Sequence, residues 1–311
     1  MNKKPPLIII GGATAVGKTS LSVKLAKAAG AEIISADSQQ VYKGMDTGTA
    51  KVTKEEMLGI THYLIDEVEP DFDFNVFEFK KRAQKYIKQI YENGHIPVLA
   101  GGTGFYIQSV LYDIDFSGED EGGEYRKSLE ALESGVLYGM LKEADPEAAK
   151  EIHPNNKKRV IRALEFYHNT GELISAHNKD QRQKESPYNY AYFVLNRNRD
   201  EIYERIEKRV DCMMQAGLVE EVKGLLEGGL SENALSMQAI GYKEIIQFLK
   251  GNISEDEAAA LIKLNTRHFA KRQITWFKRE KEAVWIDYGD YADEEAMLQE
   301  MMNILKEKNI V

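Results

Sequence analysis

A glycine-rich run near the start of the chain has the clearest capacity for chemistry. Residues 12–19 read GATAVGKT and fit the pattern GxxxxGK[ST], in which backbone N–H groups wrap a phosphate chain. The helix that begins after such a loop adds a dipole that favours an anion. Lys18 supplies a positive charge, and the hydroxyl of Thr19 can reach a Mg²⁺ ion. The run predicts binding of a di- or triphosphate, but it leaves open which compound is bound and which reaction follows.

Two further polar segments each follow a short apolar run. Asp37 follows residues 32–36, and the run GGTG at 101–104 follows residues 96–100. Ligands of parallel sheets lie beyond the carboxyl ends of the strands, so both segments could face the phosphate-binding loop. A carboxylate there could be a general base or a metal ligand, or it could only cap a turn. Glycines allow a close backbone approach, although a glycine cluster alone is weak evidence for a site.

Positive charge gathers in three segments of a chain whose formal net charge is −9. Residues 263–281 hold seven Lys or Arg and one acid, and residues 155–164 read NNKKRVIRAL. Arg205 and Arg209 lie four positions apart on an expected helix, where they could meet phosphates or pair with Glu201. Basic clusters in an acidic protein indicate a polyanion site, although each could also be a solvated helix face.

Short apolar segments that alternate with helices must position these residues. The expected strands are 7–10, 32–36, 62–66, 96–100, 190–195 and 283–287, and the expected helices include 18–29, 76–91 and 294–308. This alternation is typical of a parallel sheet. The expected fold class is α/β, with a P-loop NTPase-like parallel sheet core flanked by helices and a mainly helical insertion domain.

The insertion is expected where the composition changes after the fourth strand. Residues 117–124 are acidic and glycine-rich, and residues 177–185 are polar. We therefore expect a helical insertion at 115–188 within a core domain formed by residues 1–114 and 189–311.

Composition excludes several classes of protein. The chain has 311 residues, of which 43% are hydrophobic, and this fits a globular protein of about two domains. Its apolar runs are far shorter than the ~18–20 residues that span a bilayer. The single cysteine, Cys212, excludes a disulfide framework and a Cys-rich zinc site, and the six histidines show no metal-ligand spacing. Cys212 is expected on the apolar stripe of its helix, without a function. We expect a cytoplasmic protein with no membrane partner.

Several runs together resemble the tRNA dimethylallyltransferase family, also called the tRNA isopentenylpyrophosphate transferases, of the bacterial type. The matching runs are GGATAVGKTS, SADSQQVYKGMDTGTAK, HYLIDEVEP, AGGTGFYIQSVL, KRVIRALEFY, IYERIEKRVDCMMQAGLVEEV and SMQAIGYKEIIQFL with TRHFAKRQITWF. They follow the family's order over about residues 7–280. Ala13 stands where most members have Pro, and residues 113–124 depart from the usual proline-containing run. With a single cysteine, we do not expect the zinc finger of the eukaryotic relatives.

The resemblance implies a Mg²⁺-assisted reaction. A dimethylallyl group would pass from dimethylallyl diphosphate to N6 of the tRNA adenosine on the 3′ side of the anticodon. Asp37 is expected to accept the N6 proton, and Thr19 to bind the metal as the diphosphate leaves. Thr103 matches a position that contacts the target nucleotide, and it completes the expected catalytic set. The adenine must be flipped out of the anticodon loop to expose N6, and the insertion would grip the stem-loop through phosphates and shape.

The resemblance also assigns binding residues. The diphosphate is expected to contact Gly12, Ala13, Thr14, Ala15, Val16, Gly17, Lys18, Thr19, Arg205 and Arg209. The tRNA is expected to contact Asp37, Ser38, Gln39, Gln40, Thr103, Arg126, Lys158, Arg159, Arg162, Arg267, Lys271 and Arg272. A monomer is expected.

Two other functions use some of the same residues. A small-molecule or nucleotide kinase would share the phosphate loop and Mg²⁺ and would use Asp37 as a base toward a hydroxyl. It would leave the basic segments at 155–164 and 263–281 unexplained. A nucleotide-dependent RNA-binding switch without catalysis would instead use Asp37 for the metal.

Overall fold

The computed structural model describes residues 4–116 and 123–311. The chain divides into two compact units, one formed by Met1–Val110 with Pro187–Val311 and the other by Leu111–Ser186. The assignment of residues 115–188 as an insertion domain stays a prediction. We describe each unit by itself.

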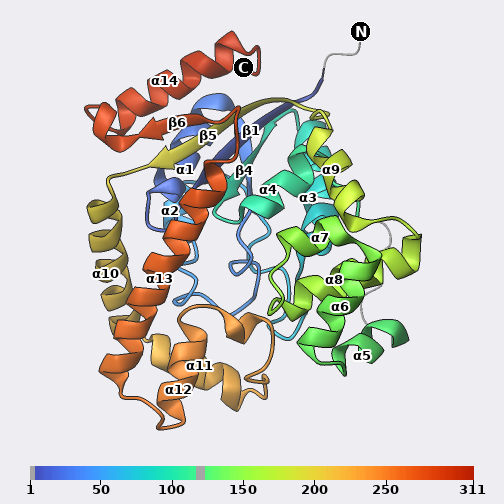
Figure 1. Ribbon diagram of the computed structural model, residues 1–311. Coiled ribbons are helices and arrows are strands. Elements are labelled where there is room, and N and C mark those ends of the chain that lie inside the picture. Colours follow the sequence, from blue (N-terminus) through green and yellow to red (C-terminus); the bar gives the residue numbers. More distant parts are fainter. Residues whose placement is uncertain (1–3, 117–122) are drawn as a thin grey trace. The chain divides into compact units, whose positions relative to one another are not determined.

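The first unit is built on a six-stranded parallel sheet with the strand order β3-β2-β4-β1-β5-β6 (Figure 1). The strands are β1 (Pro6–Gly12), β2 (Ala31–Ser35), β3 (His62–Tyr63), β4 (Ile96–Gly101), β5 (Asn189–Asn196) and β6 (Val284–Asp287). Central strands that are covered on both faces read as continuous apolar runs, and β1 is buried from Leu7 onward. The expected α/β fold is confirmed.

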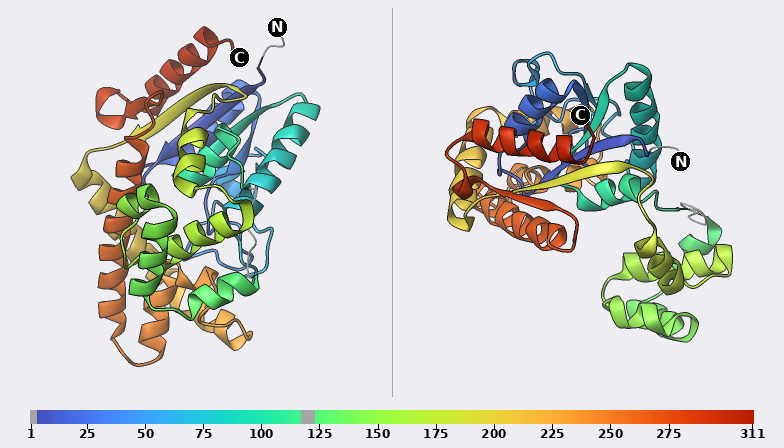
Figure 2. Two further views of the ribbon diagram at one scale, coloured as in Figure 1. Left: turned by 45° about the vertical axis from the view of Figure 1, so that its right-hand side comes forward. Right: turned by 90° about the horizontal axis from the view of Figure 1, so that it is seen from above.

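Helices cover both faces of this sheet (Figure 2). One face packs on α1 (Lys18–Ala29) and α14 (Glu294–Glu307). The other carries α3 (Val76–Glu92), α4 (Gly104–Leu111) and α13 (Glu255–Phe277). Successive strand side chains point to opposite faces, so Ile8 and Ile10 belong to the core beneath α1 and α14. On the opposite face, Phe277 closes over β1 so tightly that a Cβ at Gly11 would lie 2.6 Å from its ring.

The remaining helices of the first unit are shorter or follow β5. They are α2 (Lys54–Met57), α10 (Arg199–Gln215), α11 (Leu218–Glu227) and α12 (Tyr242–Leu249), with 3₁₀ turns at Ser236–Gln238 and Tyr288–Asp290. Helix α10 buries Ile202, Ile206 and Val210 along one stripe. The expectation that Cys212 lies on this stripe is wrong, because its side chain is exposed.

The second unit is helical throughout its described part. Its helices are α5 (Glu124–Glu130), α6 (Ser134–Ala144), α7 (Pro146–Glu151), α8 (Lys157–Thr170) and α9 (Ile174–Gln183). They share a small apolar core that includes Leu137, Leu141, Val160 and Leu164. Asp145 caps α7 by accepting from Ala148 N–H at 3.0 Å, and it also accepts from Ser175 N–H at the start of α9 at 2.9 Å.

The third strand is shorter than expected. Residues 62–66 were predicted to be extended, but β3 ends at Tyr63. Leu64 and Asp66 have left-handed φ values of +61° and +54°, which residues other than glycine rarely adopt. Hydrogen bonds hold this turn: Leu64 N–H donates to Glu67 Oε1 at 2.7 Å, and Asp66 N–H donates to the Gln40 carbonyl at 3.2 Å. These bonds outweigh the extended preference of the apolar sequence.

Candidate active site at the carboxyl ends of the strands

The phosphate-binding loop joins the end of β1 to the start of α1. Gly12 and Gly17 have φ values of +149° and +112°, so glycine relieves strain at both ends of the loop. Lys18 Nζ donates to the carbonyls of Gly12 and Ala13 at 3.0 and 2.8 Å. Burial lowers the pKa of Lys18 to about 8, while Asp37 raises it and Arg209 lowers it further. A bound diphosphate would replace these carbonyls as the partner of the ammonium group.

Three arginines that follow β5 contact the loop from one side. Arg205 Nε donates to the Ala15 carbonyl at 2.6 Å, and Arg209 Nη1 donates to Thr14 Oγ1 at 3.3 Å. Arg197 Nε donates to the Val16 carbonyl at 2.9 Å. The structure therefore brings Arg205 and Arg209 to the loop, where Arg205 supports its backbone. Arg197 was missed by the sequence interpretation, although its place directly after a strand was the available signal.

The C-terminal part of the chain also supports this loop. Tyr288 lies beneath Arg197, whose guanidinium carbon is 3.3 Å from the ring centroid. The Tyr288 hydroxyl donates to the Gly17 carbonyl at 3.3 Å, and a Cβ at Gly17 would lie 2.5 Å from that hydroxyl. The close approach requires glycine at position 17 independently of its φ value.

Asp37 lies two positions after the end of β2, beside the GGTG loop. Its Oδ1 accepts from the backbone N–H groups of Gln39 and Gln40 at 2.9 and 3.4 Å. Thr103 N–H donates to the Ala36 carbonyl at 3.2 Å, and a Cβ at Gly101 would lie 2.1 Å from that same carbonyl oxygen. The structure thus places Thr103 next to the Asp37 backbone, with glycine needed for the approach.

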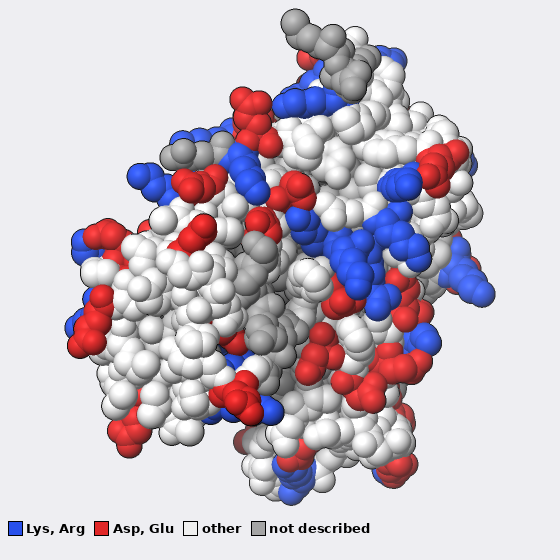
Figure 3. Space-filling view, turned by 90° about the vertical axis from the view of Figure 1, so that its right-hand side faces the viewer, with Lys and Arg blue, Asp and Glu red and all other residues white. Residues whose placement is uncertain are grey.

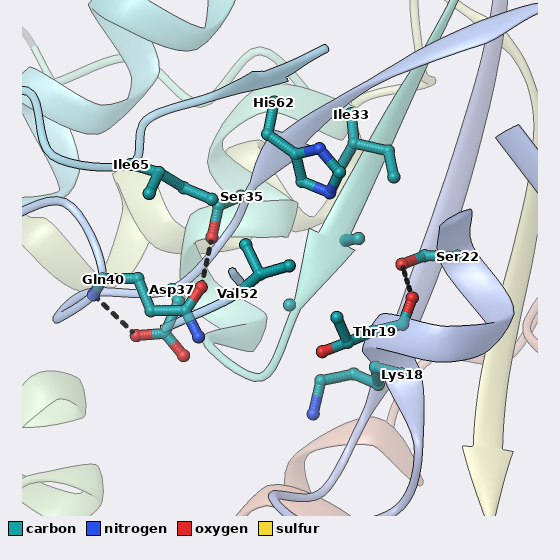
Figure 4. Close-up of a pocket in the computed structure, with 12 residues that line it drawn as sticks. Lys18, Thr19, Ser22, Ile33, Ser35, Asp37, Gln40, Val52, His62 and Ile65 are labelled. Atoms are coloured by element: carbon teal, nitrogen blue, oxygen red, sulfur yellow. Dashed lines mark hydrogen bonds between the residues drawn. The ribbon is translucent and has the colours of Figure 1, made fainter. Parts of the chain in front are cut away.

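A pocket joins these parts of the site (Figure 4). Figure 4 shows Lys18 and Thr19 on one side and Asp37 with Gln40 on the other. The lining comprises Lys18, Thr19, Ser22, Ile33, Ser35, Asp37, Gln40, Val52, His62, Ile65, Ala100 and Gly101. Gln40 is held by its side chain: Nε2 donates to the carbonyls of Thr49 and Ala50 at 3.5 and 3.3 Å, and Oε1 accepts from Ser35 Oγ at 3.4 Å.

The sequence interpretation missed several of these lining residues. His62 lies on β3, and burial lowers its pKa although its ring nitrogen Nδ1 contacts the Ile60 carbonyl at 2.9 Å. Ile65 reaches the pocket from the left-handed turn that ends β3. Ile65 lies near the carboxyl end of the strand expected at 62–66, which was the available signal, whereas His62 is the first residue of that strand and carried no such signal.

A carboxylate from a distant helix fixes the loop that holds Gln40. Glu221 on α11 accepts from the backbone N–H groups of Asp46, Thr47 and Gly48 at 3.0, 2.7 and 3.1 Å. The hydroxyl of Tyr242 donates to the same carboxylate at 2.6 Å. Burial and the neighbouring Glu221 raise the pKa of Tyr242, so its hydroxyl remains a donor at neutral pH. We call these contacts the Glu221 latch.

The basic residues of α13 divide into paired and exposed side chains. Arg267 Nη1 forms an ion pair with Glu207 at 2.6 Å, and Lys263 pairs with Asp211 at 2.6 Å. Lys271 and Arg272 are exposed farther along the helix. The polyanion surface predicted on α13 stays a prediction: Lys271 and Arg272 are exposed, whereas the charge of Arg267 is balanced by Glu207.

The second unit shows the same division. Arg126 contacts Glu130 at 3.2 Å and the buried Glu165 at 2.8 Å, which joins α5 to α8. Lys158 and Arg159 are exposed in the first turn of α8, and Arg162 is half-buried.

On the face drawn in Figure 3, Lys and Arg side chains gather in a patch that acidic side chains border. A net negative charge therefore leaves room for local basic surfaces.

A metal ion would find few protein ligands at this site. Among residues 4–116 and 123–311, no group of three or more His, Cys, Asp or Glu side chains could hold one. The Thr19 hydroxyl and the Asp37 carboxylate nevertheless line one pocket. These oxygen donors fit Mg²⁺, which usually keeps several waters and binds through one or two protein groups plus substrate phosphates.

In the described part of the chain, no helix is long and apolar enough to cross a membrane.

Comparisons with known proteins point in one direction. The family described as IPP transferase matches residues 40–280. Proteins named tRNA dimethylallyltransferase from Lachnoclostridium phytofermentans and Clostridioides difficile are 56% and 48% identical, each over 98% of this chain and 99% of the relative.

Solved structures agree with these relatives. A tRNA isopentenylpyrophosphate transferase from Staphylococcus epidermidis is 48% identical with a TM-score of 0.73, covering 98% of this chain and 100% of that chain. A eukaryotic dimethylallyltransferase described as acting on tRNA is 29% identical with a TM-score of 0.81, covering 91% of this chain and 74% of that chain.

Proposed function

The chain belongs to the IPP transferase family of tRNA dimethylallyltransferases, and from this premise we propose how its residues perform the reaction. It is a prenyltransferase that moves a dimethylallyl group from dimethylallyl diphosphate to adenosine in tRNA. The acceptor in our proposal is N6 of the adenosine on the 3′ side of the anticodon. The observation that carries the proposal is the pocket in which Lys18 and Thr19 face Asp37 and Gln40.

The reaction forms one bond and breaks another at the allylic carbon C1. Adenine N6 attacks C1, the bond from C1 to the diphosphate oxygen breaks, and the N6 proton passes to the Asp37 carboxylate. Positive charge develops on the allylic group while negative charge grows on the leaving diphosphate, so fixed donors aimed at the diphosphate lower the barrier. Lys18, Arg209 and the N–H groups of residues 12–19 are the donors we assign to this role.

Diphosphate substrates commonly need a divalent metal. Mg²⁺ would neutralise charge on the leaving diphosphate when bound, and Thr19 is the residue we assign to hold it. Asp37 then faces the acceptor side of the pocket as the general base, and Thr103 lies beside it to contact the target nucleotide.

The tRNA is held by residues outside the pocket in this proposal. Ser38, Gln39 and Gln40 would meet the flipped nucleotide, since they continue the Asp37 loop. Lys158 and Arg159 on α8, with Lys271 and Arg272 on α13, would contact backbone phosphates because their charges are exposed. Arg126, Arg162 and Arg267 would join these contacts. For Arg126 and Arg267 this requires exchanging a carboxylate partner for phosphate. We expect the protein to act as a monomer in the cytoplasm.

The test is transfer of radiolabel from dimethylallyl diphosphate to unmodified tRNA in the presence of Mg²⁺. Label should appear in tRNA and should vanish when the adenosine next to the anticodon is replaced. Asp37→Asn should lower kcat by about 10²–10⁴-fold with little change in tRNA affinity, whereas the exposed Asp71→Asn should behave as wild type. Movement of phosphate from labelled ATP to a small acceptor, with no label in tRNA, would favour a kinase instead.

A further inference from the structure

A buried glutamine links the phosphate-binding loop to the GGTG loop. Gln273 lies on α13 with 5% of its surface exposed. Its Oε1 accepts from Thr14 N–H at 2.8 Å, and its Nε2 donates to the Gly102 carbonyl at 3.0 Å. Both ends of one amide are therefore used, each by a different loop of the active site.

Glycines let α13 come this close. A Cβ at Gly102 would lie 2.2 Å from Gln273 Nε2, and a Cβ at Gly104 would lie 2.1 Å from the indole of Trp276. Phe277 makes the corresponding close approach to Gly11 on β1. Side chains of α13 thus reach the backbone of the GGTG loop and of β1, and a Cβ at Gly102 would displace the Gln273 amide from its place.

The contacts of Gln273 extend to the proposed base through neighbouring backbone bonds. Gly102 precedes Thr103, whose N–H donates to the Ala36 carbonyl at 3.2 Å, and Ala36 precedes Asp37. On the other side, Thr14 belongs to the diphosphate loop, and its hydroxyl oxygen accepts a hydrogen bond from Arg209. A short series of hydrogen bonds therefore joins the loop that holds the leaving group to the residue that removes the proton.

We propose that Gln273 is a positioning residue that sets the spacing between the diphosphate loop and the Asp37–Thr103 pair. The proposal rests on the proposed function, because these two parts of the site are assigned there to dimethylallyl diphosphate and to the target adenosine. Gln273 itself touches neither the reacting carbon nor N6. Its amide is suited to the role because it donates to a carbonyl on one loop and accepts from an N–H on the other, with a fixed length between the two.

Replacing this amide by a carboxyl group removes the donor and keeps the acceptor. In Gln273→Glu the acceptor toward Thr14 N–H remains, but an ionised carboxylate repels the Gly102 carbonyl. Displacement of reacting groups by about 1 Å can cost about 10²-fold in rate, so we expect kcat at pH 8 to fall about 10- to 100-fold. A protonated carboxyl group can donate again, and burial raises the pKa of a carboxyl group. The ratio of variant to wild-type kcat should therefore rise as the pH falls from 8 to 6.

Two controls separate this role from loss of packing. Gln273→Met keeps the volume and removes both hydrogen bonds, so its kcat should be low with a ratio to wild type that does not change with pH. The exposed Gln89→Glu on α3 should match wild type throughout. Lys18 titrates in wild type and in every variant, so dividing each variant's kcat by the wild-type kcat cancels the contribution of Lys18 to the pH dependence. Affinity for tRNA should change less than twofold in each variant, because Gln273 is buried and the exposed charges assigned to tRNA phosphates are kept.

Each outcome decides the matter. Wild type that fails to transfer label to tRNA would overturn the proposed function itself. Active wild type with a Gln273→Glu ratio near one, or a lowered ratio that stays flat with pH, would overturn only the role of Gln273. If neither variant folds, amide hydrogen exchange of wild type remains: the Thr14 N–H should be strongly protected, and rapid exchange there would refute the contact.

Discussion

Replacing Glu221 by glutamine should release the loop that holds Gln40 and weaken tRNA recognition. Glu221 makes four hydrogen bonds, two at each oxygen: Oε2 accepts from Asp46 and Thr47, and Oε1 accepts from Gly48 and Tyr242. The glutamine amide keeps one oxygen and turns an N–H group toward donors at the other position. Two bonds to a charged acceptor are then lost.

The magnitude follows from those two bonds. Hydrogen bonds to charged groups contribute about 1.5–3 kcal/mol each, so the gross loss is about 3–6 kcal/mol. Residues 46–48 are partly exposed, and water can satisfy some of the released N–H groups. We therefore expect the free energy of unfolding to fall by about 2–3 kcal/mol, which lowers Tm by roughly 4–12 °C for a folding unit of about 150–250 residues.

The functional effect should be selective. The backbone carbonyls of Thr49 and Ala50, which follow residues 46–48, accept hydrogen bonds from the Gln40 side chain. A loosened loop should raise the KM for tRNA about tenfold, or about 1.4 kcal/mol, while the KM for dimethylallyl diphosphate changes little. The assays are thermal unfolding and steady-state transfer with each substrate varied. Glu220→Gln is the matched control, because Glu220 is the exposed neighbour on the same helix.

The reasoning fails if Glu221→Gln unfolds within 1 °C of wild type (a shift far below the roughly 4 °C expected) and keeps the wild-type KM for tRNA. It also fails if Glu220→Gln is affected equally, since the loss would then follow from charge on α11 and not from the latch.

Three further predictions concern charge. Because burial lowers the pKa of Lys18 to about 8, its cation is lost above that pH in the free enzyme. The KM for dimethylallyl diphosphate should therefore rise on the alkaline side, and Lys18→Arg should move this limb to higher pH in a kcat/KM profile. Arg209→Lys should weaken diphosphate binding about tenfold by titration, since a single ammonium replaces a guanidinium that reaches Thr14 Oγ1; unchanged affinity would remove Arg209 from the diphosphate site. Lys271→Ala should weaken tRNA binding and reduce the slope of log K against log salt by about 1, whereas the exposed Lys306→Ala on α14 should leave the slope unchanged.

Local sequence patterns determined the framework of this protein. The helix predicted at 18–29 is α1, and the strand predicted at 96–100 lies within β4. Both predictions depend on neighbouring residues: an apolar run ends in glycine, and the phosphate-loop pattern sets the start of the helix. The runs shared with the family likewise lie within short stretches, which is why the resemblance was visible without coordinates.

Only the tertiary structure decided which distant side chains complete the site. Gln273 meets Thr14 across 259 positions of sequence, and Glu221 meets Thr47 across 174. Nothing within either helix distinguishes these residues from other polar side chains, because their partners are backbone groups that carry no residue-specific signal. The pairing is set by how closely α13 and α11 pack on the loops, and that depends on the whole core. The sequence therefore determined which residue types lie near each strand end, and packing decided what holds those ends in place.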